Sequence, residues 1–382
     1  MFFSNLIYLQ LLEIMINNKQ NKKNIIIFNP SIEDGGVEKN LYLITNFLAK
    51  NDKKVYLITC DLNRQNKFSK KINFLYSKYY LNSGSGRYAK YLSCLITLIN
   101  TIYNDKNYLV LSFQANIYCI IICWLLNVKI IARLNTAPQG WDHNFFKNKI
   151  YNYFIKKANA VLVNSKFFKK EVDKRYNLKS ILIYNPFDFK KIKKLSNYKI
   201  KNLYKKETIN LINVGRLTDQ KDQITIIKSL ITIVKTKKIK LIIVGKGKKE
   251  FELKQFAKKN NLENYVNFIG YKNNPYPYIK KADIFILSSK YEGSPNVLIE
   301  AQFLNKYIIS TDCPTGPREI LENYKNSKLI KVGDFVALAN IIKNFKKIKL
   351  KKNLYFFQGL YKYQLYLNCN KYLQIINHVQ KI

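Results

Sequence analysis

A short apolar run, a polar loop and a helix start follow one another in IFILSSKYEGSPNVLIE, residues 284–300. The run from Ile284 to Leu287 has the pattern of a buried strand. Ser294 is a good N-cap and Pro295 suits the first helical position, so we expect a helix from there through about Leu304. This order of elements is the unit from which parallel sheets with helical crossovers are built.

The same alternation of β-branched runs with longer amphipathic stretches is repeated along the chain. The first series of predicted strands is Asn24 to Phe28, Lys54 to Thr59, Leu109 to Phe113, Lys129 to Leu134 and Ala160 to Val163, with helices such as Glu38 to Ala49 and Ala115 to Leu126. The second series is Ile209 to Val214, Lys240 to Val244, Val266 to Phe268, Ile284 to Leu287 and Tyr307 to Ser310. Two consecutive doubly wound α/β units create a cleft, and ligands bind at the carboxyl ends of such strands.

The length of the chain supports the same division, because 382 residues exceed what one hydrophobic core usually organises. The predicted organisation is an N-terminal extension at 1–22, a first Rossmann-like domain at 23–190, a basic polar linker at 191–206, a second Rossmann-like domain at 207–350 and a closing helical segment at 351–382. Within the last segment we expect a helix from Tyr361 to Ile376.

The chain is strongly basic, with 66 Lys plus Arg against 24 Asp plus Glu and a formal net charge of +42. Nucleic acid, an anionic membrane surface or an anionic substrate would each satisfy this excess. Compositional bias is the alternative, because Lys, Asn, Ile and Tyr are abundant throughout rather than in one patch. No RNP1 run or Cys/His finger is visible, so we expect no nucleic-acid partner.

Cysteines and histidines do not form a metal-binding pattern. The six cysteines include no CxxC pair and there are two histidines, so we expect no metal and no cofactor. Cys119 and Cys123 are expected in the core, and the set fits a reducing, cytoplasmic compartment. The longest apolar run, Ile117 to Leu126, is shorter than the roughly 20 residues of a membrane span. Residues 1–14 are expected to be a mis-assigned start or a short helix.

The first of three loops at strand ends runs from Asn29 to Lys39 and contains Gly35 and Gly36 just before a helix. Paired glycines let the backbone approach a ligand closely, where the helix N-terminus favours negative charge. A plain tight turn would use the same glycines. The GxxxxGK[ST] pattern of a P-loop is missing.

The second loop follows Ile209 to Val214 and reads GRLTDQKD, residues 215–222. Arg216 and Lys221 stand at the carboxyl end of a strand, so both cations are expected to point into the cleft. A departing nucleoside diphosphate gains negative charge, and each charge-assisted contact contributes roughly 1.5–3 kcal/mol. A surface role is the alternative for Lys221, and Arg216 is the better candidate because Arg is used sparingly.

The third loop is the opening segment, which carries two carboxylates in an acid-poor chain. Glu292 precedes the helix, and Glu300 lies on its second turn near the cleft. One carboxylate can accept hydrogen bonds from sugar hydroxyls and the other from a ribose diol, while amides from Gly293 to Val297 face a diphosphate. A helix cap with a surface Glu is the alternative.

In combination these loops resemble glycosyltransferase family 4, which is retaining and has the two-domain GT-B fold. The resemblance runs from about Asn24 to Ile382 and includes a C-terminal helix that returns to the first domain. It rests on Gly35-Gly36-Val37-Glu38, on Gly215-Arg216-Leu217 to Lys221, and on Glu-x7-Glu from Glu292 to Glu300, with support from Asn164-Ser165, Tyr184-Asn185-Pro186, Val244-Gly245-Lys246-Gly247 and Ser310-Thr311-Asp312-Cys313-Pro314.

The resemblance implies a role for each matching residue. Arg216 and Lys221 would bind the donor diphosphate, and Glu292 would hold the sugar hydroxyls. The implied donor-binding set is Gly215, Gly245, Gly293, Ser294, Asn296, Val297, Leu298 and Glu300, the last of which would bind the ribose. Gly35 and Gly36 would approach the reacting region from the first domain. Many relatives have a histidine where this chain has Arg133 and Asn135, which are expected to serve the acceptor or the contact between domains.

The implied reaction is transfer of a hexose or N-acetylhexosamine from a UDP-linked sugar to a lipid-linked glycan acceptor, in cell-surface polysaccharide, lipopolysaccharide or glycoconjugate biosynthesis. Same-face attack, with the leaving phosphate helping to take the proton, needs no protein nucleophile. The rivals are a non-catalytic basic protein that binds membrane or nucleic acid, and a GT-B nucleotide-sugar epimerase or phosphorylase.

A lipid-linked acceptor would place the protein on the cytoplasmic face of a membrane. The segment from Phe145 to Lys157 interleaves aromatic residues with lysines, as an interfacial helix does. A buried helix with snorkelling lysines has the same pattern.

Overall fold

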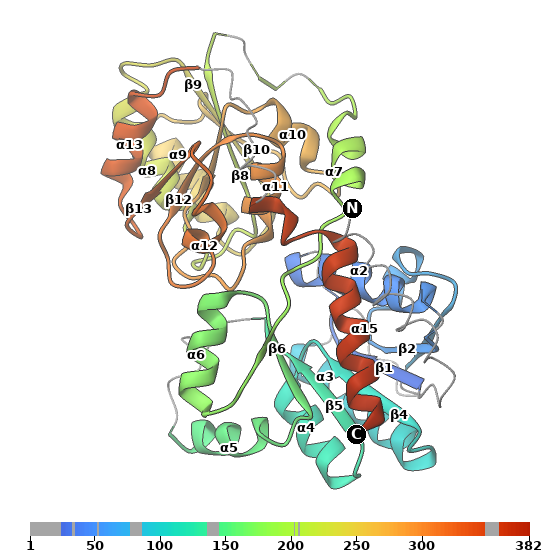
Figure 1. The fold of residues 1–382 in the computed structure, drawn as a ribbon. Coiled ribbons are helices and arrows are strands. Elements are labelled where there is room, and N and C mark those ends of the chain that lie inside the picture. The colour runs from blue at the N-terminus through green and yellow to red at the C-terminus, as the bar shows by residue number, and fades with distance from the viewer. Residues whose placement is uncertain are drawn as a thin grey trace, which may run out of the picture.

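Two parallel sheets with helices on both faces make up the protein (Figure 1). The computed structural model describes residues 24–32, 35–51, 53–76, 86–135, 145–201, 203–204, 207–347 and 359–382. The predicted α/β fold with two doubly wound units is confirmed. The expectation for residues 1–14 falls outside the described residues.

The first sheet has seven strands in the order β3-β2-β1-β4-β5-β6-β7. Its strands are β1 (Asn24–Phe28), β2 (Val55–Ile58), β3 (Ile72–Leu75), β4 (Tyr108–Ser112), β5 (Lys129–Arg133), β6 (Ala160–Val163) and β7 (Ile181–Leu182). The helices are α2 (Gly36–Lys50), α3 (Arg87–Asn104), α4 (Asn116–Leu125), α5 (Phe145–Ile155), α6 (Lys166–Tyr176) and the 3-10 helix η1 (Leu62–Lys67). Helix α2 covers one face of the sheet, and α3 to α6 cover the other.

The second sheet has six strands in the order β10-β9-β8-β11-β12-β13. Its strands are β8 (Ile209–Val214), β9 (Ile239–Val244), β10 (Val266–Phe268), β11 (Ile284–Leu287), β12 (Tyr307–Thr311) and β13 (Ser327–Ile330). The helices are α7 (Phe189–Ser196), α8 (Gln223–Ile233), α9 (Glu250–Lys259), α10 (Tyr276–Lys281), α11 (Asn296–Phe303), α12 (Pro317–Leu321) and α13 (Phe335–Lys343). Helices α8, α9 and α13 cover one face, and α7, α10, α11 and α12 the other.

Central strands read as continuous apolar runs because both faces of each sheet are covered. In β1, Ile25 to Phe28 are fully buried, as expected for a strand inside a parallel sheet. Strands β3, β7 and β13 were not predicted from the sequence. All three lie at sheet edges, where partly exposed residues weaken the apolar signal.

The segment predicted to be a polar linker contains helix α7. The Asp188 side chain accepts a hydrogen bond from the Lys191 N–H at 2.9 Å and caps the helix. Ile192 and Leu195 join the core of the second domain, and α7 packs against α10. The helix was not predicted because the many lysines of this segment made it look polar, although one side of the helix is buried.

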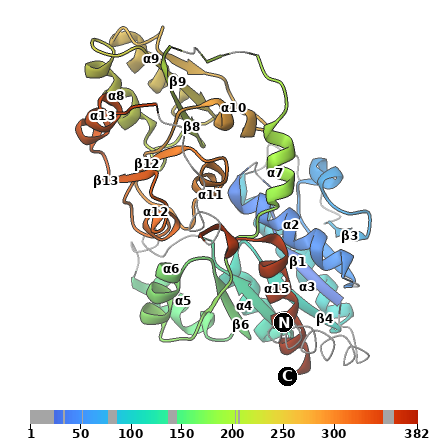
Figure 2. The ribbon, with the colours of Figure 1, turned by 45° about the horizontal axis from the view of Figure 1, so that its top comes forward.

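Helix α15 (Leu365–Lys381) carries the chain back to the first domain, as the resemblance implied. Its buried residues Cys369, Tyr372, Ile376 and Val379 belong to the core beneath α2. Figures 1 and 2 both show this helix lying along the first domain. At the crossover, the Phe187 N–H donates to the Tyr363 carbonyl at 2.8 Å. Two separate chain passages therefore join the domains.

Candidate active site between the domains

The loop between β11 and α11 forms the centre of the site. Helix α11 begins at Asn296 with Pro295 as its N-cap, one residue later than the sequence predicted. Pro295 is extended, with φ −70° and ψ 100°, and its carbonyl accepts the first helical hydrogen bond from the Leu298 N–H at 3.0 Å. Since the N-cap is the residue whose carbonyl starts the helix, Pro295 takes the place predicted for Ser294.

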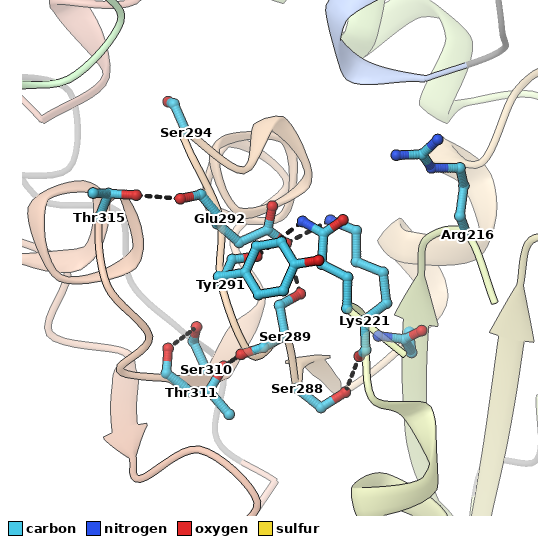
Figure 3. A network of polar contacts seen from close by, with 12 residues as sticks. Arg216, Lys221, Ser288, Ser289, Tyr291, Glu292, Ser294, Ser310, Thr311 and Thr315 are labelled. Carbon is cyan, nitrogen blue, oxygen red and sulfur yellow. Dashed lines mark hydrogen bonds and ion pairs between the residues drawn. The ribbon is translucent and has the colours of Figure 1, made fainter. Parts of the chain in front are cut away.

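Glu292 and Lys221 form an ion pair where strands β11 and β8 end (Figure 3). The Lys221 Nζ lies 2.5 Å from Glu292 Oε1, and both side chains are largely buried. Ser289 Oγ donates to the same oxygen at 2.6 Å. The Thr315 hydroxyl donates to the Glu292 carbonyl. The carboxylate is therefore fixed in one orientation by its own domain.

Arg216 is exposed and lies on the loop that follows β8, which also carries Lys221 (Figure 3). The loop is held by a close backbone approach to Gly245, which has φ +154°. A Cβ added to Gly245 would lie 1.8 Å from the Gly215 carbonyl oxygen. Gly215 and Gly245 thus position the loop that carries Arg216.

Glu300 is fully buried, and its closest cation comes from the opposite domain. The Lys39 Nζ, on α2, lies 2.7 Å from Glu300 Oε1. The Tyr276 hydroxyl donates to the same oxygen at 3.2 Å, and the Tyr276 ring lies 5.3 Å from the Lys39 Nζ. Burial raises the pKa of Tyr276, so it donates as a neutral hydroxyl. Among the described residues, Glu300 Oε2 is buried without a hydrogen-bond partner.

Asn296 connects the start of α11 to the glycine loop of the first domain. Its Nδ2 donates to the Gly36 carbonyl at 3.0 Å, and its Oδ1 accepts from Asn185 Nδ2 at 2.7 Å. A Cβ on Gly36 would lie 3.2 Å from Asn296 Nδ2. Gly35 donates its N–H to Glu38 Oε2 at 3.0 Å. The two predicted loops therefore meet where the domains contact each other.

Arg133 does not face an acceptor. It is 1% exposed, and it donates to the Tyr372 hydroxyl at 2.7 Å, to Asn185 Oδ1 at 2.7 Å and to Asn135 Oδ1. Asn135 Nδ2 donates to the Phe113 carbonyl at 2.7 Å. The acceptor alternative for Arg133 is therefore wrong, because the guanidinium lies inside a polar network linking β5, α15 and Asn185.

Two family models match consecutive parts of the chain. The model for Glycosyltransferase Family 4 matches residues 34–191, and the model for Glycosyl transferases group 1 matches residues 196–358. The chain belongs to glycosyltransferase family 4. The first domain carries one of the two matches and the second domain the other, which agrees with the two sheets.

Relatives of this chain include an uncharacterized glycosyltransferase of Methanocaldococcus jannaschii, 38% identical over 206 residues, which are 51% of each chain. An N-acetylgalactosamine-N,N'-diacetylbacillosaminyl-diphospho-undecaprenol 4-alpha-N-acetylgalactosaminyltransferase of Campylobacter jejuni is 29% identical over 237 residues, 59% of this chain and 63% of the relative. The match thus spans about half of the first relative and less than two thirds of the second.

The solved structure of HepE from Anabaena, in complex with UDP and glucose, has the same fold. Its TM-score is 0.73 at 19% sequence identity, and the match covers 93% of this chain and 100% of that one. At this identity the likeness establishes the GT-B fold.

The remaining predicted donor residues lie around the start of α11. Gly293 packs beneath Gly316, which has φ +83° and whose added Cβ would lie 2.7 Å from the Gly293 carbonyl oxygen. Ser294 is half-buried, and Val297 packs at the margin of the core. Leu298 is fully buried and its N–H already donates to Pro295. We therefore reassign Leu298 from donor contact to the core of the second domain.

Sequence reasoning missed four side chains that complete the site: Lys39, Ser289, Tyr276 and Asn185, the last of which supported the resemblance without a role. Ser289 sits three residues before Glu292, a spacing that could have indicated the contact. Lys39 and Tyr276 reach Glu300 only through tertiary packing, and nothing in the sequence pairs them.

Metal-binding groups of three or more His, Cys, Asp or Glu residues do not occur in the part of the chain that the structure describes. Within the same ranges, no helix has both the length and the apolar character needed to cross a bilayer. Cys119 and Cys123 are fully buried, as predicted.

Proposed function

We propose that this protein is a retaining glycosyltransferase that transfers a hexose or N-acetylhexosamine from a UDP-linked sugar to a lipid-linked glycan acceptor, in cell-surface polysaccharide or glycoconjugate biosynthesis. Family membership supports glycosyl transfer. The contacts made by Lys221, Glu292 and Glu300 support the site for the donor, and the relatives support the choice of UDP and of a lipid-linked acceptor.

The ion pair between Lys221 and Glu292 carries the proposal. The two charges neutralise each other at a distance of 2.5 Å. A diphosphate entering beside Arg216 offers Lys221 a second anion, and the ammonium can contact phosphate as the bond to the sugar breaks. Glu292 is then available to accept hydrogen bonds from the sugar hydroxyls. The pair thus supplies a cation for the leaving group and an acceptor for the sugar.

Glu300 fits the ribose of the nucleotide. Its Oε2 is a buried acceptor without a partner among the described residues, and leaving such an atom unpaired costs about 1–3 kcal/mol. A ribose hydroxyl is the donor that a nucleotide sugar would bring. The Tyr276 hydroxyl and Lys39 hold Oε1, which leaves Oε2 for the ligand.

UDP as the nucleotide rests on the relatives. HepE is crystallised with UDP and glucose, and the Campylobacter jejuni relative is named for N-acetylgalactosamine transfer to a diphospho-undecaprenol acceptor. In the proposed route to retention, the acceptor attacks from the face that the leaving group departs from, and the leaving phosphate takes the proton. The reaction is proposed to need no metal ion or cofactor, because Arg216 and Lys221 supply the positive charge. Undiminished transfer in excess chelator is the expected result.

The proposal places the protein at the cytoplasmic face of the membrane that holds the lipid-linked acceptor, and it includes no nucleic-acid partner. Glycan transfer to such an acceptor is a reaction between one water-soluble substrate and one held in the bilayer. The protein would then meet the membrane peripherally, through the first domain.

The proposal is tested with a panel of nucleotide sugars and a polyprenyl-diphosphate glycan acceptor. Wild type is compared with Glu292→Ala, Arg216→Ala and Glu300→Ala. Removing a contact made to the transition state should lower the rate about 10²–10³-fold. Undiminished transfer by the Arg216 and Glu292 variants would refute the site. NMR of the product linkage reports retention, and a freed or epimerised sugar without glycan transfer would favour a phosphorylase or an epimerase.

A further inference from the structure

Helix α3 exposes an apolar stripe on the side that faces away from the sheet. Tyr88, Leu92 and Tyr103 are 83%, 62% and 75% exposed, and Ile96 and Ile99 are also exposed. At 3.6 residues per turn these five positions fall within an arc of about 80°. An ordinary surface helix would carry polar residues there.

The opposite side of α3 is also apolar. Cys94, Leu98 and Ile102 are buried against the first sheet. A helix that is apolar on both sides is normally covered on both, yet the described residues cover only the inner one. Contiguous exposed apolar surface of this kind is typical of interaction sites.

Helices α4 and α5 extend this surface. They cover the same face of the sheet as α3, with α3 in contact with α4 and α4 in contact with α5. Leu125 is 67% exposed, and Trp124, Tyr153 and Ile150 are exposed as well. Figure 1 shows α4 and α5 at the end of the first domain that lies away from the second domain. We call the exposed residues of α3, α4 and α5 the outer helix face.

The absence of acidic residues from the outer helix face favours an anionic partner. The sequences of α3, α4 and α5 contain no Asp or Glu. The Lys157 Nζ lies 5.7 Å from the Trp124 ring and 5.0 Å from the Tyr153 ring. Aromatic rings beside cations, next to an acid-free apolar surface, are the composition of a protein face at an anionic lipid headgroup layer.

We propose that the outer helix face docks this protein on an anionic lipid bilayer. The inference deepens the proposed function, since a lipid-linked acceptor would be held in the same membrane. In a parallel α/β domain, helices begin at the edge where the strands end, so Tyr88 marks the end of the stripe nearest the cleft. An acceptor anchored in that bilayer would then lie beside the cleft entrance.

Helix α5 is buried on one side, as a packed helix is, and exposes apolar residues on the other, as an interfacial helix does. Ile155 is buried and Tyr151 packs against Tyr176, whereas Ile150 and Tyr153 are exposed. The side chains of residues 145–147 lie outside the described residues. Five of the ten large apolar residues exposed on α3, α4 and α5 belong to α3, which the sequence did not single out.

The test is vesicle sedimentation of the full chain with phosphatidylcholine alone and with added phosphatidylglycerol, over a series of salt concentrations. The stripe variant is Leu92→Asn with Tyr103→Asn. The matched control is Phe251→Asn with Val336→Asn, two positions of the second domain that are 72% and 56% exposed. We expect the stripe variant to lower partitioning to phosphatidylglycerol vesicles by about tenfold or more. The control should sediment as wild type does, and added salt should weaken the vesicle binding of both proteins.

Equal sedimentation of the stripe variant and wild type would overturn the proposal, as would absence of wild-type binding at low salt. If light scattering shows a wild-type dimer that the stripe variant loses, without vesicle binding, the face is a contact between two copies and the proposal fails. Calorimetry with UDP on the same preparations tests the proposed donor separately from membrane docking. UDP binding without vesicle binding would refute only the docking proposal. Vesicle binding without UDP binding would refute only the proposal that the donor is linked to UDP.

Discussion

Lys39 Nζ and Glu300 Oε1 lie 2.7 Å apart across the cleft between the two domains. Glu300 is fully buried, whereas the Lys39 side chain keeps some exposure. The neutral Tyr276 hydroxyl is the other donor to this oxygen. A buried carboxylate depends strongly on its cation. The first domain therefore helps to hold the residue that we assign to the ribose in the second domain.

Replacing Lys39 with Met should weaken UDP binding about tenfold and lower the free energy of unfolding by about 1–3 kcal/mol, since Glu300 loses its charged donor. The two effects are measured by calorimetry and by urea unfolding. If Lys39 acts through Glu300, the variant should also lose most of the preference for UDP over 2′-deoxy-UDP, as Glu300→Gln should.

The matched control is Lys50→Met, at the exposed end of the same helix, which should leave both quantities unchanged. Lys39→Arg should restore binding because it keeps the cation. Equal weakening of UDP and 2′-deoxy-UDP by Lys39→Met would show that its effect does not pass through the ribose contact.

Arg133→Leu should destabilise the protein by about 3 kcal/mol, because the Tyr372 hydroxyl and Asn185 Oδ1 would each lose a buried donor. Since Asn185 also holds Asn296, UDP affinity should fall as well. Arg318→Leu, which breaks an exposed ion pair with Asp312, serves as control and should change stability by less than about 1 kcal/mol. Similar unfolding midpoints for the two variants would contradict the buried role.

The sequence predicted the central strands and the three loops because local patterns encode them. Ile25 to Phe28 could be recognised as a strand without any tertiary information, and so could the turn that contains Gly35 and Gly36. Edge strands such as β13 were missed because their residues are partly exposed. Arg133 contacts Tyr372 on α15, and Lys39 contacts Glu300 on α11. Both contacts join residues far apart in the sequence, so no local pattern could predict them.

Gly245→Ala should displace the loop of Arg216, because the new methyl group would lie 1.8 Å from the Gly215 carbonyl oxygen. We expect a loss of about 3 kcal/mol or more in the free energy of unfolding, together with loss of UDP binding. Gly333→Ala is the control, because Gly333 also has positive φ, at +78°, but nothing lies within 4 Å of an added Cβ. It should cost about 1 kcal/mol. Equal losses would assign the whole effect to backbone conformation.

Cys60 should be the most reactive of the described thiols at neutral pH. Its Sγ lies 3.4 Å from Cys94 Sγ, and the hydrogen bond from Cys94 is the main reason that its pKa falls to about 7. Since the thiolate is the reactive form, alkylation by iodoacetamide should rise through pH 7. Cys94→Ala should move this midpoint upward, whereas burial raises the pKa of Cys369 to about 12 and should keep it unmodified. Peptide mass spectrometry measures both sites, and an unchanged midpoint in Cys94→Ala would remove the hydrogen bond as the cause.

Glu292→Gln and Lys221→Met should have different effects on UDP binding. Because Glu292 pairs with Lys221, it would compete with the diphosphate for this cation, so Glu292→Gln should leave UDP affinity unchanged or raise it a few-fold while transfer falls about 10²–10³-fold. Lys221→Met should lower both, because no second group replaces its charge at that position. Ser289→Ala, which removes only the hydroxyl that orients Glu292, should reduce transfer with little effect on UDP binding. Calorimetry and initial rates on the four proteins separate these outcomes. If Glu292→Gln weakens UDP binding as much as Lys221→Met does, Glu292 and Lys221 both support UDP binding. The proposal that Lys221 exchanges Glu292 for the diphosphate would then be wrong.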